Sequence, residues 1–266
     1  MRFKNKTVIV TGGGGGIGLA TAKRFAAEGA KIVLADIDAD ILNKAQDELN
    51  TAGAEGVWIS QCDVSNEQQV EATVTGAIKQ FGSLDVIVNN AGLMIFKKLE
   101  EQTADDWHRI LDVDLLGAFF FIKHAFLQMK NGGAIINISS IHAIETTPMV
   151  ATYAAAKAAL LSLTRSASIE GKAKGIRVNA ILPGAIDTPM LWQNPNIKAG
   201  LEQVSKDSVG KPEDIAAVVA FLSSDDAAFG RDAEEKDAPV AGAKDVEELK
   251  AEIKRLTASI DELKSR

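Results

Sequence analysis

The stretch from Thr11 to Gly18 constrains the fold of this chain most, because nearly every residue in it is glycine. A β-branched run, 7–10, precedes it and an alanine-rich segment, 19–27, follows it, so the order is strand, glycine turn and helix. Glycines permit a tight turn and let backbone N–H groups approach a pyrophosphate, while the start of the helix favours an anion. The stretch predicts a dinucleotide-binding turn, although a glycine-rich hairpin or a flexible linker has the same composition. The unbroken run fits two glycine spacings, Gly13, Gly15 and Gly18 or Gly12, Gly16 and Gly18. The glycines alone therefore do not show which type of dinucleotide-binding fold is present, and later residues must decide.

The composition fits one α/β domain and argues against several other classes of protein. With 266 residues, of which 46% are hydrophobic, the chain can bury one substantial core. The net charge of −7 and an isoelectric point near 5.1 argue against a nucleic-acid surface, which requires clustered basic residues. The single cysteine, Cys62, excludes an internal disulfide, and the N-terminal residues lack the apolar core of a signal peptide, so a cytoplasmic location is predicted. The most apolar segment, 115–122, is too short to span a bilayer, and no membrane partner is expected.

Short hydrophobic runs alternate with helical patterns along the first two thirds of the chain. This alternation predicts a parallel sheet covered by helices on both faces, with ligands at the carboxyl ends of the strands. The spacing of apolar residues from Trp107 to Leu115 predicts one long helix over 105–129. The expected strands are 7–10, 31–35, 57–61, 84–88, 134–138 and 176–181.

Asp36 ends the second expected strand about 20 residues after the glycines, where a carboxylate meets the two ribose hydroxyls of an adenosine. It would repel a 2′-phosphate, and the stretch 36–43 contains no lysine or arginine that could receive one. The sequence therefore predicts NAD as the cofactor, against the alternative that Asp36 is only a turn residue. Asp63, after the third strand, either bonds an adenine edge or caps the helix that begins near Ser65.

Four motifs follow one another in an order that is specific when taken together. They are the stretch Thr11 to Gly18, the segment Asn89 to Gly92, Ser140, and Tyr153 with Lys157 four positions later. Over about residues 4 to 226 the sequence resembles the classical short-chain dehydrogenase/reductase family. The resemblance implies a single-domain, Rossmann-like doubly wound parallel sheet. It also implies an NAD-dependent oxidoreductase that interconverts a secondary alcohol and its ketone.

The resemblance assigns the chemistry to Ser140, Tyr153 and Lys157. Hydride transfer from a carbinol carbon requires a proton to move on the oxygen, and a tyrosine hydroxyl acts as acid or base when its ionised form is stabilised. Lys157 lies one helical turn from Tyr153, and its cation would stabilise the ionised tyrosine. By the resemblance, Lys157 also bonds the nicotinamide ribose. Ser140 would hold the substrate oxygen, whereas Ser139 is expected to point to the other side of the strand. The cofactor contacts implied are Gly12, Gly16, Ile17, Gly18, Asp36, Asp63, Val64, Asn90, Ala91, Gly92, Tyr153, Lys157, Pro183, Gly184, Ile186 and Thr188.

Asp114 departs from the family pattern, which usually has an asparagine at this place in the helix motif. In the family that asparagine helps to hold a water in the proton relay, so the resemblance puts Asp114 among the catalytic residues. An ionised carboxylate near Tyr153 would oppose formation of a phenolate. We therefore expect Asp114 either to be neutralised or to lie slightly away from the relay; the alternative is an aspartate on the helix surface.

The substrate residues implied by the resemblance are mostly apolar, which favours a hydrophobic or alicyclic secondary alcohol. Lys97 and Lys98 are cations that could bind a carboxylate, so a substrate that carries a carboxylate stays an alternative. His142 either forms a hydrogen bond with the substrate or only shapes a loop. Three histidines and one cysteine show no metal-ligand spacing, so no metal is expected. The implied substrate contacts are Met94, Ser140, His142, Met149, Met190 and Trp192.

The C-terminal part of the sequence leaves the family pattern, which continues into a last strand and a glycine-rich end. The expected NAD-binding domain is 1–230, followed by a charged linker, 231–244, and a helix, 245–266, with a coiled-coil repeat of apolar residues. We expect this helix to join subunits of a homodimer or homotetramer; the alternative is that it packs on its own subunit. The altered end and Asp114 also motivate a second hypothesis, a non-catalytic NAD-binding scaffold or regulator.

Overall fold

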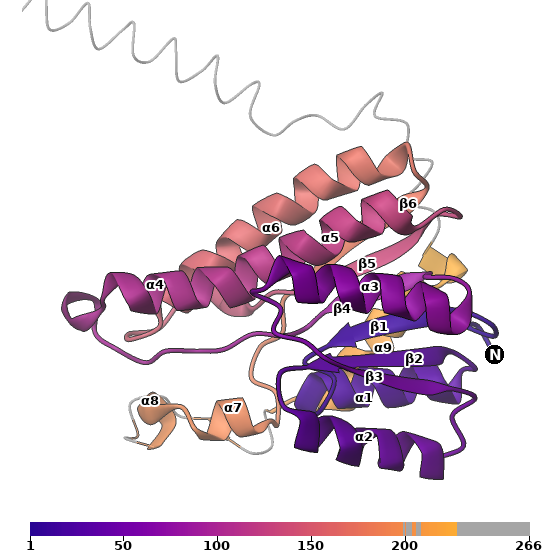
Figure 1. Ribbon diagram of the computed structural model, residues 1–266. Coiled ribbons are helices and arrows are strands. Elements are labelled where there is room, and N and C mark those ends of the chain that lie inside the picture. Colours follow the sequence, from indigo (N-terminus) through magenta and orange to yellow (C-terminus); the bar gives the residue numbers. More distant parts are fainter. Residues whose placement is uncertain (199, 201–203, 206–208, 228–266) are drawn as a thin grey trace, which may run out of the picture. The chain divides into compact units, whose positions relative to one another are not determined.

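A parallel six-stranded sheet organises the computed structural model, which describes residues 1–198, 200, 204–205 and 209–227 (Figure 1). Its strands are β1 (Thr7–Thr11), β2 (Lys31–Asp36), β3 (Val57–Gln61), β4 (Val86–Asn89), β5 (Gly133–Ile138) and β6 (Ile176–Ile181). Their order is β3-β2-β1-β4-β5-β6, so the chain first builds one side of β1 and then the other. Such a reversal leaves a crevice at the carboxyl ends of the strands. The predicted Rossmann-like doubly wound sheet is confirmed.

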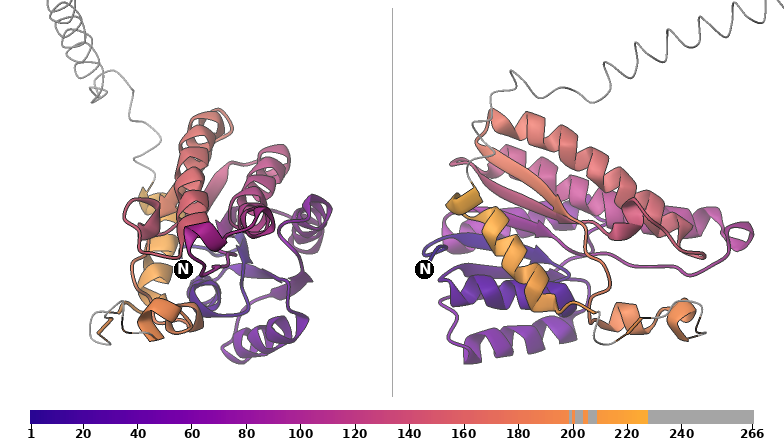
Figure 2. Two further views of the ribbon diagram at one scale, coloured as in Figure 1. Left: turned by 90° about the vertical axis from the view of Figure 1, so that its left-hand side faces the viewer. Right: turned by 180° about the vertical axis from the view of Figure 1, so that it is seen from behind.

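Helices cover both faces of the sheet (Figures 1 and 2). One face carries α1, α2 and α9, and the other carries α3, α5 and α6. The helices are α1 (Gly16–Ala27), α2 (Ala39–Thr51), α3 (Glu67–Phe81), α4 (Ala104–Leu111), α5 (Gly117–Gln128), α6 (Ala151–Lys172), α7 (Pro189–Trp192), α8 (Pro195–Lys198) and α9 (Pro212–Ser223).

Alternating side chains of β1 enter two separate hydrophobic cores. Val8 and Val10 pack with Phe25 of α1, whereas Ile9 packs with Phe121 of α5 on the opposite face. A strand buried on both faces is apolar at every position, which is why the strands read as continuous hydrophobic runs. Each large side chain buried in this way contributes roughly 1.5–3 kcal/mol, so the two cores fix the strand ends that carry the site.

Polar caps fix where the helices begin. Asp38 accepts hydrogen bonds from the N–H groups of Asp40 and Ile41 at the start of α2, at 2.9 and 3.3 Å. Asn66 caps α3 in the same way. Because Asp38 is engaged in the cap, Asp36 is the carboxylate left at the end of β2.

The long helix predicted over 105–129 is divided into α4 and α5 by a π-helical turn, η2 (Asp112–Leu116). π turns inside helices occur often at functional sites, because the extra residue changes which side chains face inward. Asp114 lies in this turn and is only 1% exposed.

The C-terminal predictions lie outside the described residues. These are the linker 231–244, the helix 245–266 and the last residues of the predicted domain 1–230. Within the described part of the chain, no helix is both long enough and apolar enough to cross a membrane.

Candidate active site

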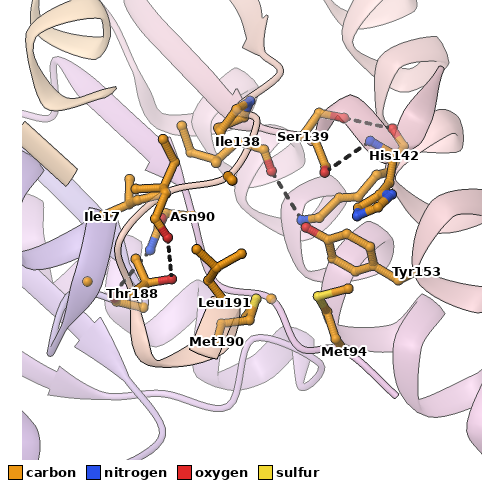
Figure 3. Close-up of a pocket in the computed structure, with 18 of the residues that line it drawn as sticks. Ile17, Asn90, Met94, Ile138, Ser139, His142, Tyr153, Thr188, Met190 and Leu191 are labelled. Carbon is orange, nitrogen blue, oxygen red and sulfur yellow. Dashed lines mark hydrogen bonds between the residues drawn. The ribbon is translucent and has the colours of Figure 1, made fainter. Parts of the chain in front are cut away.

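A cavity of about 560 Å³ opens at the carboxyl ends of the strands (Figure 3). Its size is typical of a site for a cofactor or a small ligand. The glycine turn, the segments that follow β4 and β5, the start of α6 and part of 183–194 line it. Asp36, Ser140, Tyr153 and Lys157 all lie on its wall, so residues from distant parts of the chain share one space.

The glycine turn between β1 and α1 has a backbone that larger residues do not fit. Gly12 and Gly16 have φ angles of +60° and +50°, in the left-handed region that favours glycine. A Cβ at Gly18 would lie 2.0 Å from the Gly12 carbonyl oxygen, so α1 starts in close contact with the turn. Gly15 caps α1 with no atom near its missing side chain, which leaves the start of the helix open to an anion.

Asp36 is bound to the glycine turn by its carboxylate. The N–H groups of Gly14 and Asp38 donate to its two oxygens at 3.2 and 3.3 Å. The described lining of the cavity contains no arginine, and its one lysine, Lys157, is paired with Asp114. No free cation on this lining would therefore receive a 2′-phosphate beside Asp36.

Asn90, Ala91 and Gly92 line the cavity where β4 ends. The Thr11 hydroxyl accepts hydrogen bonds from the N–H groups of Asn90 and Ala91, both at 2.9 Å. The Asn90 amide donates to the Thr11 carbonyl at 2.9 Å, so this segment is fixed against the end of β1. Four more of the predicted cofactor residues, which follow β6, also line the cavity, namely Pro183, Gly184, Ile186 and Thr188.

Asp63 and Val64, two predicted cofactor residues, are not on the described lining of this cavity. Asp63 Oδ1 accepts from the Ser65 N–H at 2.9 Å and from the Ser65 hydroxyl at 2.6 Å. These bonds fix the turn before α3, but the helix itself is capped by Asn66, so Asp63 is not the cap. The adenine contact of Asp63 stays a prediction. Val64 packs against Gly117, where a Cβ would lie 2.8 Å from Val64 Cγ2.

Tyr153 and Lys157 occupy successive turns at the start of α6. Figure 3 shows Tyr153 near Ser139 and His142, which follow β5. Tyr153 and Lys157 are buried, with 8% and 3% of their surface exposed. Lys157 Nζ lies 5.5 Å from the centre of the Tyr153 ring and donates a hydrogen bond to the Ile138 carbonyl at 3.1 Å. The ammonium is therefore held by the end of β5 and close to the phenol.

The two serines after β5 make different contacts, although both line the cavity. The Ser139 hydroxyl donates to the Lys157 carbonyl at 2.9 Å, which ties β5 to α6. Ser140 Oγ accepts from the His142 N–H at 3.2 Å, so its own proton stays available to a ligand oxygen. Ser140 thus has the arrangement expected of a group that holds a substrate oxygen.

Asp114 forms a buried pair with Lys157, and it does not lie on the helix surface. Its Oδ2 atom lies 3.1 Å from Lys157 Nζ, and its Oδ1 atom accepts from the Leu93 N–H at 3.0 Å. Gly92 permits this packing, because a Cβ there would lie 2.7 Å from Asp114 Oδ2. The carboxyl group therefore contacts both the lysine and the loop after β4.

Burial controls the charges of this pair. It raises the pKa of Asp114 above its ordinary range, although Lys157 and the Leu93 N–H oppose the shift. Burial alone would lower the pKa of Lys157, but the charges of Asp114 and Tyr153 outweigh it, and the pKa of Lys157 is raised. Lys157 is therefore an ammonium at neutral pH, and Asp114 keeps a proton to a higher pH than an exposed aspartate does.

Three predicted substrate residues, Met94, His142 and Met190, line the half of the cavity next to Tyr153 (Figure 3). The rings of His142 and Tyr153 meet edge to face, with their centres 6.0 Å apart. Met149 and Trp192 are not on the described lining, and the Trp192 indole donates to Asp187 Oδ1 at 2.7 Å. Their predicted substrate contacts stay predictions.

Sequence reasoning missed several lining residues on two loops. These loops lie just after Ser140 and in and around α7. The one feature of the sequence that could have indicated them is that each loop follows the end of a predicted strand. No group of three or more histidine, cysteine, aspartate or glutamate side chains in the described ranges could hold a metal ion. The missed residues on these loops are Glu145, Thr146, Thr147 and Asn194, and Ile41 of α2 was missed as well.

Known proteins are similar to this chain in sequence and in fold over most of its length. The family model described as enoyl-(acyl carrier protein) reductase matches residues 13–231. The 3beta-hydroxysteroid dehydrogenase 1 of Eggerthella lenta is 39% identical over 85% of this chain and 90% of its own. The cis-4-hydroxycyclohexanecarboxylate dehydrogenase of Sinomonas cyclohexanicum is also 39% identical, over 85% and 92%. The crystal structure of levodione reductase superimposes with a TM-score of 0.80 and 38% identity, covering 86% of this chain and 94% of that one. The chain belongs to the classical short-chain dehydrogenase/reductase family.

Proposed function

We propose that this chain is an NAD-dependent oxidoreductase that interconverts an apolar or alicyclic secondary alcohol and its ketone. The observation that carries the proposal is the meeting of Ser140, Tyr153 and Lys157 in one cavity with the glycine turn and Asp36. Relatives that are named as dehydrogenases of a hydroxysteroid and of cis-4-hydroxycyclohexanecarboxylate support the same reaction class.

The residues present suit a nicotinamide dinucleotide. The glycine turn and the open start of α1 would hold the pyrophosphate, and Asp36 would accept the hydroxyl groups of the adenosine ribose. Once bound, the cofactor supplies a hydride donor or acceptor at its nicotinamide. Lys157 already uses two acceptors, Ile138 and Asp114, so its third N–H remains for a ribose hydroxyl in the cavity.

The protein residues then move one proton. The Ser140 hydroxyl would hold the substrate oxygen, and the Tyr153 hydroxyl would take the proton of an alcohol or give one to a ketone. The Lys157 ammonium stabilises the phenolate that this transfer requires. Asp114 would hold the ammonium and the loop after β4 in place. Burial raises the pKa of Asp114, which favours the neutral form that does not oppose the phenolate.

Tyr153→Phe tests this assignment, because it removes only the transferable proton and keeps the ring. We expect kcat to fall by about a thousandfold or more, while the Kd for NADH, followed by its fluorescence, stays nearly unchanged. Retention of most of the kcat would overturn the mechanism.

The scaffold hypothesis keeps one supporting observation, the carboxyl group of Asp114 where the family usually has an amide. A panel of secondary alcohols, assayed by formation of reduced nicotinamide, distinguishes the two functions. Turnover of any member supports the oxidoreductase, whereas a blank panel with tight NAD binding supports the scaffold.

A further inference from the structure

The half of the cavity that lies away from the glycine turn carries one carboxylate, that of Glu145. Asp36 ends β2, whereas Glu145 follows β5, and β1 and β4 lie between these strands. With about 4.8 Å between neighbouring strands, the ends of β2 and β5 are about 14 Å apart. Asp36 therefore belongs to the half near the glycine turn, and Glu145 to the half with Ser140 and Tyr153.

Glu145 has a fixed backbone and a free carboxylate. It follows the 3-10 turn η3 (Ile141–Ala143), and its N–H donates to the Ile141 carbonyl at 2.9 Å. Across the described ranges its carboxylate forms no ion pair. The side chain is exposed and also lines the cavity, so it stands where a substrate meets solvent.

No free lysine or arginine balances Glu145 on the described lining. Lys157 is bound to Ile138 and paired with Asp114, each at 3.1 Å. Lys97, which the sequence left open for a substrate carboxylate, is held by Asp106 at 2.7 and 2.8 Å and does not line the cavity. Apart from Ser139, Ser140, Tyr153 and Lys157, the polar side chains that line this half are His142, Thr146, Thr147 and Asn194.

We propose that Glu145 is a specificity-determining residue that disfavours secondary alcohols carrying a carboxylate and admits neutral alcohols and those carrying an ammonium group. The inference rests on the proposed function, since it names the substrate class of that same site. A substrate carboxylate would meet Glu145 with no free cation on the described lining to offset the repulsion, whereas an ammonium group would be attracted. Two unit charges about 4–6 Å apart in water change an equilibrium by about three- to sixfold.

Three alcohols of one shape test the inference, namely 4-methylcyclohexanol, 4-hydroxycyclohexanecarboxylate and 4-aminocyclohexanol. The variants are Glu145→Gln and the control Glu170→Gln, which removes the same charge from the exposed end of α6. At low ionic strength, Glu145→Gln should raise the carboxylate-to-methyl ratio of kcat/KM about three- to sixfold and lower the amino-to-methyl ratio as much. High salt should remove most of this change, because exposed charges are screened.

Ratios that stay within about twofold of the parent, or that shift equally in Glu170→Gln, would overturn the inference. Calorimetric binding of cyclohexanecarboxylate and cyclohexylamine to the NADH-saturated protein measures the same discrimination without turnover. If no alcohol is oxidised but Glu145→Gln still tightens carboxylate binding relative to amine binding, the proposed function fails and this inference holds. If turnover is normal and neither assay responds to Glu145, the inference fails and the proposed function holds.

Discussion

Asp36 is oriented by backbone N–H groups, those of Gly14 and Asp38, and not by a cation. Its carboxylate therefore faces a ligand at the end of β2 without a paired cation among the described residues. A ribose with free hydroxyls can donate to it, whereas a 2′-phosphate would be repelled. We expect a strong preference for NAD over NADP.

Asp36→Ala is predicted to lower the ratio of kcat/KM for NAD to that for NADP by about tenfold or more, because the repulsion disappears. Asp36→Asn removes the charge and keeps an oxygen for the Gly14 N–H, so it separates the two effects. Asp40→Ala, at an exposed position of α2, is the control of equal charge. Equal kcat/KM values for the two cofactors in the unmutated protein would contradict the assignment.

The π turn η2 is the element that brings Asp114 into the site. It joins α4 to α5 and presents the carboxyl group to Lys157 and to the Leu93 N–H. A pKa raised by burial means that the folded chain holds this proton to a higher pH than the unfolded chain does. Stability linked to Asp114 is therefore present at low pH and is lost as the pH rises above the ordinary aspartate range.

Asp114→Asn is predicted to keep or raise kcat/KM, because no carboxylate then opposes the phenolate. The gain should be largest at a pH low enough for phenolate to be scarce but above the range in which Asp114 keeps its own proton. The melting temperature of the variant minus that of the parent should increase as the pH rises, because the parent then buries a charged carboxylate and the variant buries a neutral amide. Rate profiles and thermal melts across acidic to alkaline pH measure both effects.

Asp112→Asn is the matched control for this variant, because it makes the same change in the same turn at a half-buried position. A large loss of activity in Asp114→Asn alone would show that the carboxylate itself is required. A melting difference that does not change with pH would contradict the buried charge.

The strands could be predicted from sequence because each is a short apolar run that is buried on both faces. The runs predicted at 84–88 and 134–138 are strands at Val86–Asn89 and Gly133–Ile138. The π turn could not be predicted in the same way, since apolar spacing continues from Ile110 to Leu115 without a break. Glu145 was missed for a different reason: it lies in a loop without periodicity, and only the path of the chain brings it to the cavity.

Assembly is the property of the whole molecule that depends on residues outside the described ranges. From Val246 to Leu263 apolar residues recur at alternating spacings of three and four, and β-branched residues alternate with leucine as in two-stranded parallel coiled coils. About three heptads are marginal as a lone helix in water, so the apolar stripe requires a partner. We favour a second subunit as that partner, because covering the helix's own subunit does not require heptad regularity.

Leu256→Lys, or truncation after Ala243, is predicted to lower the oligomeric state measured by light scattering and to leave the circular dichroism of the α/β fold unchanged. Ala258→Lys introduces the same charge on the outward side of the predicted helix and should not change the mass. A parent that is a dimer or tetramer would then lose subunits only where a lysine enters the apolar seam, because burying that charge is costly. If both disruptive variants keep the parent's mass at low protein concentration, the seam is not an essential subunit contact, and packing on its own subunit is the better account.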